Sequence, residues 1–209
     1  MSKQIINIEN LDRVDMFKKF INYPQPIGSA TATLNINKLM KFKKRGHKLN
    51  SLINYCILKA CYRIKEFHYL YEKNTLYYCD KISMFGVVKG KDEKLYLSTW
   101  NYYDNYIDFE NNYKDTNKKV HDTNKSIVTS DGAIVSSSTV IQFPFDNLII
   151  NMGEDIKHSY FTWGAYKKKF IKYEQPITIR FHHAFFDGEQ IGLFFKYLQE
   201  EIKNFKIKY

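Results

Sequence analysis

The sequence contains the run Pro176-Ile177-Thr178-Ile179-Arg180-Phe181-His182-His183-Ala184-Phe185-Phe186-Asp187-Gly188, which combines a strand pattern, two adjacent histidines and a turn signal. Alternate residues of a strand share a face. One face is therefore predicted to carry Ile177, Ile179, Phe181 and His183, and the other Thr178, Arg180 and His182. Apolar residues recur at helical spacing after Gly188, which predicts a closing helix. The pattern indicates a corner at which a strand turns into the last helix.

The histidine pair at this corner is the leading candidate for chemistry. His183 ends an apolar row, and a partly desolvated imidazole favours its neutral form, which can act as a general base near pH 7. A core histidine that donates to a backbone carbonyl is the structural alternative. Adjacent strand histidines face opposite ways and no Cys or Glu completes a ligand set, so no metal is expected. Asp187 can cap the last helix or pair with a buried cation.

Length and composition predict one domain covering residues 1–209. The chain is 44% hydrophobic and 17% aromatic, enough apolar mass to exclude intrinsic disorder. No run approaches the length of a membrane span, and the first residues show no secretory signal. The cysteines Cys56, Cys61 and Cys79 lack metal spacing, and the first two are expected in the core. A cytoplasmic protein with reduced thiols is expected.

The net charge of +10 raises the question of an anionic partner. Arginine, whose planar fork reads guanine edges and phosphates, is rare among the basic residues. The arginines are Arg13, Arg45, Arg63 and Arg180. We therefore expect no nucleic-acid partner. A solvated lysine surface, a positive rim that attracts an anionic cofactor, and a non-enzymatic basic binding module remain open.

Periodicity along the chain predicts an α+β fold, with a mixed β-sheet and helices packed against it. Helices are expected at residues 11–20 and 51–67, the second capped by Ser51, and a surface helix or long loop at 100–124. Strands are expected at residues 31–36, 76–78, 84–89, 94–98, 133–145, 148–152, 160–170 and 177–183.

The run from His182 to Gly188 matches the HHxxxDG signature of the chloramphenicol acetyltransferases, and the chain resembles that family over nearly its whole length. Residues 12–17 resemble the family's N-terminal helix with its Arg and Phe. Residues 136–138 and 145–146 resemble its Asn-Ile-Ser and Phe-Asp, and residues 162–166, Thr-Trp-Gly-Ala-Tyr, resemble its Thr-Met-Gly-Lys-Tyr.

The resemblance implies acetyl transfer from acetyl-CoA to a hydroxyl of chloramphenicol, conferring antibiotic resistance, in a homotrimer with active sites between subunits. His183 would be the base in a ternary complex, and Ser138 would donate to the tetrahedral oxyanion. Thr162 would hold the intermediate through water, and Tyr166 would line the CoA side. An ion pair of Arg13 with Asp187 would fix the corner that aims His183.

Departures from the family pattern fall on the acceptor pocket. Phe20 stands where the family has Tyr, and Val88 stands where it has an aromatic wall residue. The segment Phe85-Gly86-Val87-Val88-Lys89 replaces the family's Phe-Thr-Val-Phe-His, and bulky Trp163, Phe185 and Phe186 are candidates to compensate. An acyltransferase of the same fold acting on another small hydroxyl or amine acceptor is the alternative.

Overall fold

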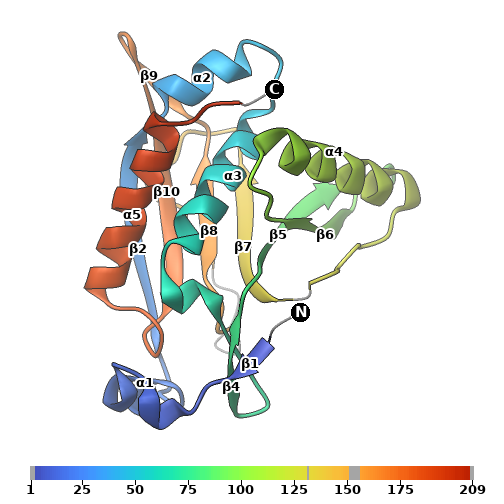
Figure 1. Cartoon of the computed structure of the whole chain (residues 1–209). Coiled ribbons are helices and arrows are strands. Elements are labelled where there is room, and N and C mark those ends of the chain that lie inside the picture. Colours follow the sequence, from blue (N-terminus) through green and yellow to red (C-terminus); the bar gives the residue numbers. More distant parts are fainter. Residues whose placement is uncertain (1–2, 131, 151–155, 208–209) are drawn as a thin grey trace.

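A computed structural model describes residues 3–130, 132–150 and 156–207. Its central feature is a seven-stranded sheet in the order β2-β10-β8-β7-β5-β6, with β9 paired to β10 (Figure 1). These strands are β2 (Ile27–Asn35), β5 (Ile82–Lys89), β6 (Leu95–Asn101), β7 (Ala133–Val140), β8 (Tyr160–Gly164), β9 (Lys167–Lys169) and β10 (Lys172–His182). The pairs β5–β7 and β7–β8 are parallel and the other neighbours antiparallel, so the sheet is mixed.

Helices pack on one face of this sheet, which confirms the predicted α+β class. The helices of the described residues are α1 (Val14–Phe20), α2 (Asn37–Lys43), α3 (Leu49–Tyr62), α4 (Tyr106–Thr123) and α5 (Gly188–Lys203), with 3-10 turns at Ile8–Asn10 and Lys65–His68. Of these, α1 lies beyond the end of the sheet rather than on its face (Figure 1). Figure 1 shows α3 and α5 in front of the strands. The stacked rings of Phe161 and Phe194, with centroids 5.0 Å apart, join β8 to α5 in the core.

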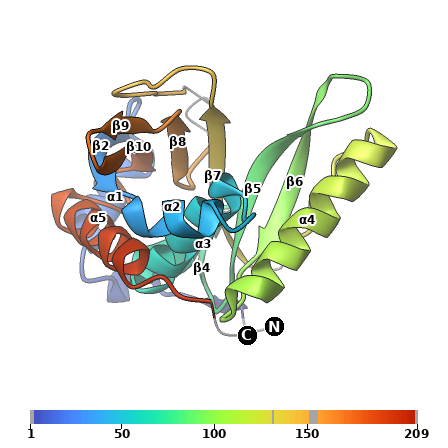
Figure 2. The same cartoon turned by 90° about the horizontal axis from the view of Figure 1, so that it is seen from above.

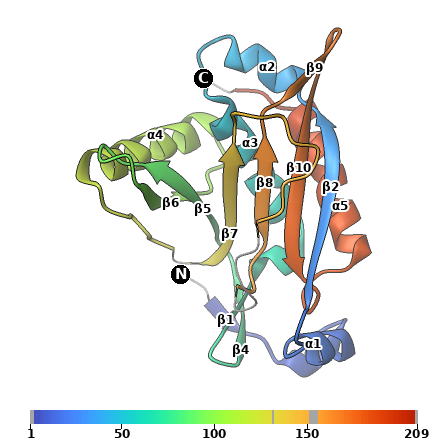
Figure 3. The ribbon, with the colours of Figure 1, turned by 180° about the vertical axis from the view of Figure 1, so that it is seen from behind.

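The opposite face of the sheet is covered by chain rather than by helices. Figure 3 shows that residues 141–150, which follow β7, run across β8 and β10. As a result β10 is buried on both faces: Thr178, Arg180 and His182 are as buried as the apolar residues that alternate with them. The predicted alternation therefore gives the direction in which each side chain of β10 points, but both faces of the strand are buried.

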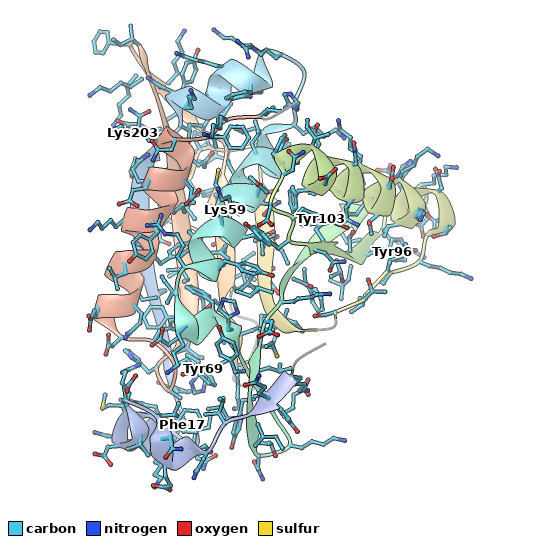
Figure 4. The ribbon with its side chains drawn as sticks, in the orientation of Figure 1. Phe17, Lys59, Tyr69, Tyr96, Tyr103 and Lys203 are labelled. Atoms are coloured by element: carbon cyan, nitrogen blue, oxygen red, sulfur yellow. The ribbon has the colours of Figure 1, made fainter. Side chains whose placement is uncertain are left out.

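A smaller sheet and a diverging hairpin complete the fold. The strands β1 (Lys3–Ile5), β3 (Tyr69–Glu72) and β4 (Thr75–Cys79) form a three-stranded sheet in the order β1-β4-β3. The label of Phe17 in Figure 4 marks α1 at this end of the molecule, and its ring packs edge-on against Tyr71, with centroids 5.7 Å apart. The hairpin β5–β6 carries α4 on one side and diverges from β7, as Figure 2 shows from above.

Several predicted boundaries need correction. The helix predicted at 51–67 begins at Leu49 and ends at Tyr62, and Ser51 lies inside it, where it accepts a hydrogen bond from Tyr106 instead of capping. Of the two alternatives predicted for residues 100–124, a surface helix or a long loop, the structure shows the helix, α4. Residues 148–150 form no strand, because the backbone of Leu148 bonds to threonine side chains of the sheet; Met152 lies outside the described residues. The free cysteines are buried, as predicted for Cys56 and Cys61.

Within the described residues, no helix combines the length and apolar character needed to cross a bilayer. The same residues contain no group of three or more His, Cys, Asp or Glu side chains arranged to hold a metal ion.

Candidate active site

The corner between β10 and α5 is held by backbone hydrogen bonds and a helix cap. The amide of His183 donates to the Pro26 carbonyl at 2.7 Å, and the amides of Phe185 and Phe186 donate to the His182 carbonyl. Asp187 begins α5 with a capping box: its carboxylate accepts from the Glu189 amide at 2.9 Å, and its own amide donates to the Gln190 side chain at 3.0 Å. Two of the four orphan amides of the helix end are satisfied in this way.

His183 lies in this turn with its imidazole held in one tautomer. Its Nδ1 is 3.2 Å from the Phe186 carbonyl oxygen. A carbonyl only accepts, so in the neutral ring Nδ1 carries the proton and Nε2 keeps its lone pair. The ring of Phe20 lies against the imidazole, with centroids 5.3 Å apart and planes tilted by 30°, and Phe181 meets it edge-on at 5.3 Å. The half-buried imidazole can therefore take a proton at Nε2.

His182 occupies the other side of the strand and is 1% exposed. Its Nδ1 accepts a hydrogen bond from the Ala184 amide at 3.1 Å, which places the proton of the neutral ring on Nε2. That Nε2 has no hydrogen-bond partner in the described part of the chain. Burial, together with Lys157 and Arg180, lowers the pKa of His182 to about 4, so the ring is neutral at pH 7. Its contact with Ala184 braces the turn that presents His183.

Arg13 and Asp187 lie in contact, although their sequence positions are far apart. The Arg13 Nε is 3.1 Å from the Asp187 carboxylate, and another guanidinium nitrogen of Arg13 donates to the Phe185 carbonyl at 2.9 Å. The side chains of Arg13 and Asp187 are 18% and 39% exposed. Asp187 therefore both caps α5 and pairs with a cation, and Arg13 ties α1 to the turn that carries His183.

A second set of predicted residues lies on the sheet itself. Ser138 pairs in register with Thr162, and Thr162 pairs with Thr178. Thr178 shares a hydrogen bond of 2.9 Å with Thr31 on β2, which extends this row of hydroxyl groups to a fourth strand. The Thr162 hydroxyl donates to the Leu148 carbonyl, so it has no proton left for a ligand and can only accept. Burial raises the pKa of Tyr160, and the neighbouring Ser138 hydroxyl partly opposes that rise.

The structure does not bring His183 and Ser138 together within one chain. His183 is five residues beyond Thr178 along β10, which corresponds to about 16 Å along the strand direction. Ser138 is also two strands away, adding roughly 10 Å across the sheet. A base and an oxyanion donor must both reach one carbonyl group within hydrogen-bonding distance. A site that uses both residues therefore needs two copies of the chain.

Tyr166 lines a cavity of about 510 Å³ between the sheet, the α2–α3 connection and α4. The ammonium of Lys43 lies 4.6 Å from the centroid of the Tyr166 ring and donates to its hydroxyl at 3.2 Å. The cavity is lined by Lys43, Lys48, Leu49, Asn50, Tyr113, Ile141, Trp163, Gly164, Ala165, Tyr166 and Gln175. Thr162 is not among these residues, so the two positions predicted to bind the cofactor lie in different surroundings.

The two residues predicted to line the acceptor pocket, Phe20 and Val88, also lie in different places. Phe20 contacts His183, but Val88 pairs with Tyr96 on the sheet face opposite to Ser138. Because Phe85 pairs with Ser136, it is Phe85 and Val87 that share the face of Ser138. Gly86 leaves room for the Trp100 ring, which a Cβ atom at that position would strike.

The three bulky residues that were predicted to compensate for the changed acceptor pocket lie in the core. Trp163, Phe185 and Phe186 are each at most 5% exposed. Phe185 packs on Phe17 of α1, with ring centroids 5.6 Å apart, and Phe186 packs on Phe67 at 4.6 Å. Neither phenylalanine is therefore available to rebuild an acceptor wall.

Sequence reasoning missed one polar pair on the Ser138 face. The Ser136 hydroxyl is 2.8 Å from Nε2 of His158, and burial together with Arg180 lowers the pKa of His158 to about 4. His158 precedes β8 in a connecting segment and is 22 positions from Ser136, so no local pattern predicts the contact. The neutral imidazole satisfies a buried hydroxyl and anchors the segment over the sheet.

A mixed sheet whose strand-to-helix corner presents a histidine with a free Nε2 lone pair is suited to removing a proton from an attacking hydroxyl. The corner carries the histidine pair and the Asp-Gly turn of the HHxxxDG signature. The fold and this corner define an acyltransferase.

Comparison with known proteins gives the family. The model of the chloramphenicol acetyltransferase family matches residues 1–199. A chloramphenicol acetyltransferase of Clostridium perfringens is 30% identical over 213 positions, covering 99% of this chain and 97% of the relative. One from Staphylococcus aureus is 24% identical over 210 positions, covering 97% of each. The chain belongs to the chloramphenicol acetyltransferase family.

Solved structures agree on the fold. A chloramphenicol acetyltransferase structure superposes with a TM-score of 0.82 at 20% identity, covering 96% of this chain and 100% of that one. A probable dihydrolipoamide acetyltransferase from Listeria monocytogenes superposes with a TM-score of 0.73 at 10% identity, covering 97% of each chain.

Proposed function

We propose that this protein, as one domain covering residues 1–209, transfers the acetyl group of acetyl-CoA to a hydroxyl of chloramphenicol. The observation that carries the proposal is the hydrogen bond between His183 Nδ1 and the Phe186 carbonyl, because it leaves Nε2 as the proton acceptor. The names of the relatives supply the acceptor, chloramphenicol, and the acetyl group that is transferred, while acetyl-CoA is the donor that the family resemblance implies. Acetylation of the drug in the cytoplasm would confer resistance.

In the proposed ternary complex, His183 moves a proton twice: it first accepts one from the acceptor hydroxyl and later returns it to the leaving group. His183 Nε2 takes the proton of the acceptor hydroxyl as that oxygen attacks the thioester carbonyl carbon. Ser138 donates its hydroxyl hydrogen to the resulting oxyanion, a contact worth about 10²–10³ in rate. When the C–S bond breaks, His183 returns the proton to the leaving thiolate. Thr162 accepts from a water that contacts the intermediate, and no metal takes part.

The separation of His183 from Ser138 supports an assembly in which neighbouring copies complete each other's sites, and we propose the family's homotrimer. Large apolar side chains are exposed on the segment that crosses the Ser138 side of the sheet: Ile141, Phe143 and Ile149. Such residues are typical of the buried centre of an interface between identical chains. Arg13 and Asp187 would hold each His183 in position toward its neighbour.

A second acceptor class is favoured by one observation. The residue whose ring lies against the His183 imidazole is Phe20, which lacks a hydroxyl. A pocket without this polar group loses a hydrogen bond worth about 0.5–1.5 kcal/mol to a polyhydroxyl acceptor such as chloramphenicol. A less polar small alcohol or amine would not lose it.

The test is thiol release from acetyl-CoA with chloramphenicol and with a panel of small alcohols and amines. Chloramphenicol-dependent release that disappears in His183→Ala supports the proposal, and Lys73→Gln, an exposed change in the β3–β4 turn, serves as the matched control. Release with another acceptor but not with chloramphenicol would reject the drug and retain the transferase. Release that survives in His183→Ala would reject the base.

A further inference from the structure

The hairpin that joins β9 to β10 ends in two apolar residues that the protein does not bury. Lys169 pairs with Lys172 across the hairpin, so Phe170 and Ile171 form its turn. Their side chains are 97% and 85% exposed, more than any other large apolar residue in the described part of the chain. They therefore contribute almost no apolar burial to the stability of the fold.

The backbone of this turn favours other residue types. Phe170 has a φ of 49°, in the left-handed region that glycine adopts readily and bulky residues rarely adopt. Two-residue hairpin turns are typically formed by pairs such as Gly-Asn for this reason. Folding therefore does not explain why Phe and Ile occupy this turn, and a contact made by their side chains would.

The hairpin is held against α2 by hydrogen bonds. The side-chain amide of Asn37 donates to the Ile171 carbonyl at 3.3 Å and accepts from the Tyr173 amide at 2.6 Å. The Tyr173 carbonyl accepts from the Ile36 amide at 2.9 Å. Figures 1 and 3 show the hairpin beside α2, with its turn projecting at that end of the molecule. The two apolar side chains are therefore presented on a fixed support.

Positive charge surrounds this apolar turn. Two lysines of the hairpin pair with Asp146 and Glu174. The other lysines at this end of the molecule form no ion pair with a described carboxylate, and those of α2 and α5 line a shallow cavity that Asn37 also lines and that contains no acidic residue. These unpaired lysines are Lys38, Lys41, Lys168, Lys172 and Lys203.

An apolar turn among unpaired lysines matches the surface of a membrane that contains anionic lipids. Ammonium groups are attracted to lipid phosphates, while apolar side chains enter the boundary between headgroups and acyl chains. A nucleic acid would match the lysines but leave the aliphatic Ile171 without a suitable contact. A second copy of the chain would match the apolar pair but would bring the same positive charge against it.

We propose that the turn of the β9–β10 hairpin is a contact site for anionic membrane surfaces, in which Phe170 and Ile171 enter the bilayer interface and the neighbouring lysines contact headgroup phosphates. Such a peripheral contact differs from a membrane span, which no described helix can form. Because β10 begins at Lys172 and ends at His182, the contact lies at the opposite end of this strand from His183. The inference does not depend on the proposed function.

The experiment is co-sedimentation of the whole protein with phosphatidylcholine vesicles that contain or lack phosphatidylglycerol. The wild type should bind the anionic vesicles alone, and at least about fivefold more weakly at ~0.5 M than at ~0.1 M salt. The variant Phe170→Gly, Ile171→Asn should lose at least about tenfold in partition coefficient. Its urea midpoint should not fall, because Gly-Asn suits the turn. Ile5→Asn, which removes an exposed apolar residue at the other end of the molecule, should match the wild type (Figure 1).

The lysines are tested separately. Lys168→Gln, Lys172→Gln should weaken binding to anionic vesicles about ten- to thirtyfold at the lower salt concentration. The matched control, Lys73→Gln, Lys196→Gln, removes two exposed charges elsewhere and should weaken it by less than about twofold. Equal losses in these two variants would mean that net charge alone attracts the protein, and would overturn the assignment to the hairpin.

Fluorescence gives a second readout. The native Trp100 and Trp163 are buried, so Phe170→Trp adds an exposed indole whose emission should shift to shorter wavelength on anionic vesicles. An unshifted emission, no preference for anionic vesicles, or binding that the Gly-Asn variant retains would overturn the proposal. Self-association that this variant loses, without vesicle binding by the wild type, would assign the turn to a second copy instead. Acetyl transfer without vesicles should be equal in the wild type and this variant, and a loss would assign the turn to the enzyme reaction.

Discussion

Removing the Arg13–Asp187 contact tests how the corner that carries His183 is held. Asp187 makes two separable interactions: it caps α5 through the Glu189 amide and pairs with Arg13 at 3.1 Å. Asp187→Asn keeps a good helix cap and removes the charge, whereas Asp187→Ala removes both. The cap contributes about 1 kcal/mol, and a partly exposed ion pair contributes about 1 kcal/mol rather than the 3–5 kcal/mol of a fully buried one.

We therefore expect losses in the free energy of unfolding of about 1 kcal/mol for Asp187→Asn and about 2 kcal/mol for Asp187→Ala. Arg13→Ala should cost about 2 kcal/mol, because the Phe185 carbonyl also loses its donor. The double variant Arg13→Ala, Asp187→Asn should lose about 1 kcal/mol less than the sum of the two single changes, since both remove one contact.

The assay is urea unfolding at one fixed protomer concentration, because an oligomer's stability depends on it. Additive losses across the cycle would refute a direct interaction between the two side chains. Equal losses for Asp187→Asn and Asp187→Ala would refute the separate contribution of the cap.

Three further predictions concern the histidines and the acceptor pocket. His183→Ala should lower kcat by at least about 10²-fold. His182→Ala removes the acceptor of the Ala184 amide and should mainly lower the urea midpoint of unfolding. A large loss of kcat in His182→Ala with little loss in His183→Ala would show that the two roles are exchanged. The pKa values of His158 and His182 are lowered to about 4 in the folded state, so below pH 6.5 the unfolded chain binds more protons than the folded one. The temperature of thermal unfolding should therefore fall between pH 7 and pH 5, and it should fall less steeply in His158→Gln. A flat profile would mean that neither ring is buried and neutral. Phe20→Tyr should raise kcat/KM for chloramphenicol by about two- to tenfold, and a decrease would show that the hydroxyl is not accommodated beside His183.

The connection from β10 to α5 could be predicted from the sequence because the patterns that define it are local. The apolar alternation of β10, the Asp-Gly turn and the helical spacing of α5 follow one another without interruption. The sequence did not predict helix α2, because its apolar residues are few and are interspersed with lysines. These apolar residues are Leu39, Met40 and Phe42, and all of them are buried. The apolar residues 148–150 predict a strand, but the Thr162 and Thr178 side chains bind the backbone of Leu148.

The arrangement of the candidate site was harder to predict from the sequence than the fold. The contact of Arg13 with Asp187 and that of Phe20 with His183 join residues more than 160 positions apart, so no local pattern predicts them. The resemblance implied the first contact and, for Phe20, only a place in the acceptor pocket. The resemblance also grouped Val88 with the acceptor pocket, but the register of β5 on β7 turns Val88 away from Ser138. Composition does not predict register, because a shift by one residue exchanges the two faces.

In the proposed assembly, His183 of one copy works with Ser138 of another. The most direct measurement is acetyl transfer by proteins co-expressed from equal amounts of a His183→Ala chain and a Ser138→Ala chain, each nearly inactive alone. If neighbouring copies share sites, mixed assemblies contain intact sites wherever the two variants meet in the right order, and about a quarter of wild-type activity should return. Activity no greater than that of the separate variants would show that both residues act within one chain, and would contradict the account.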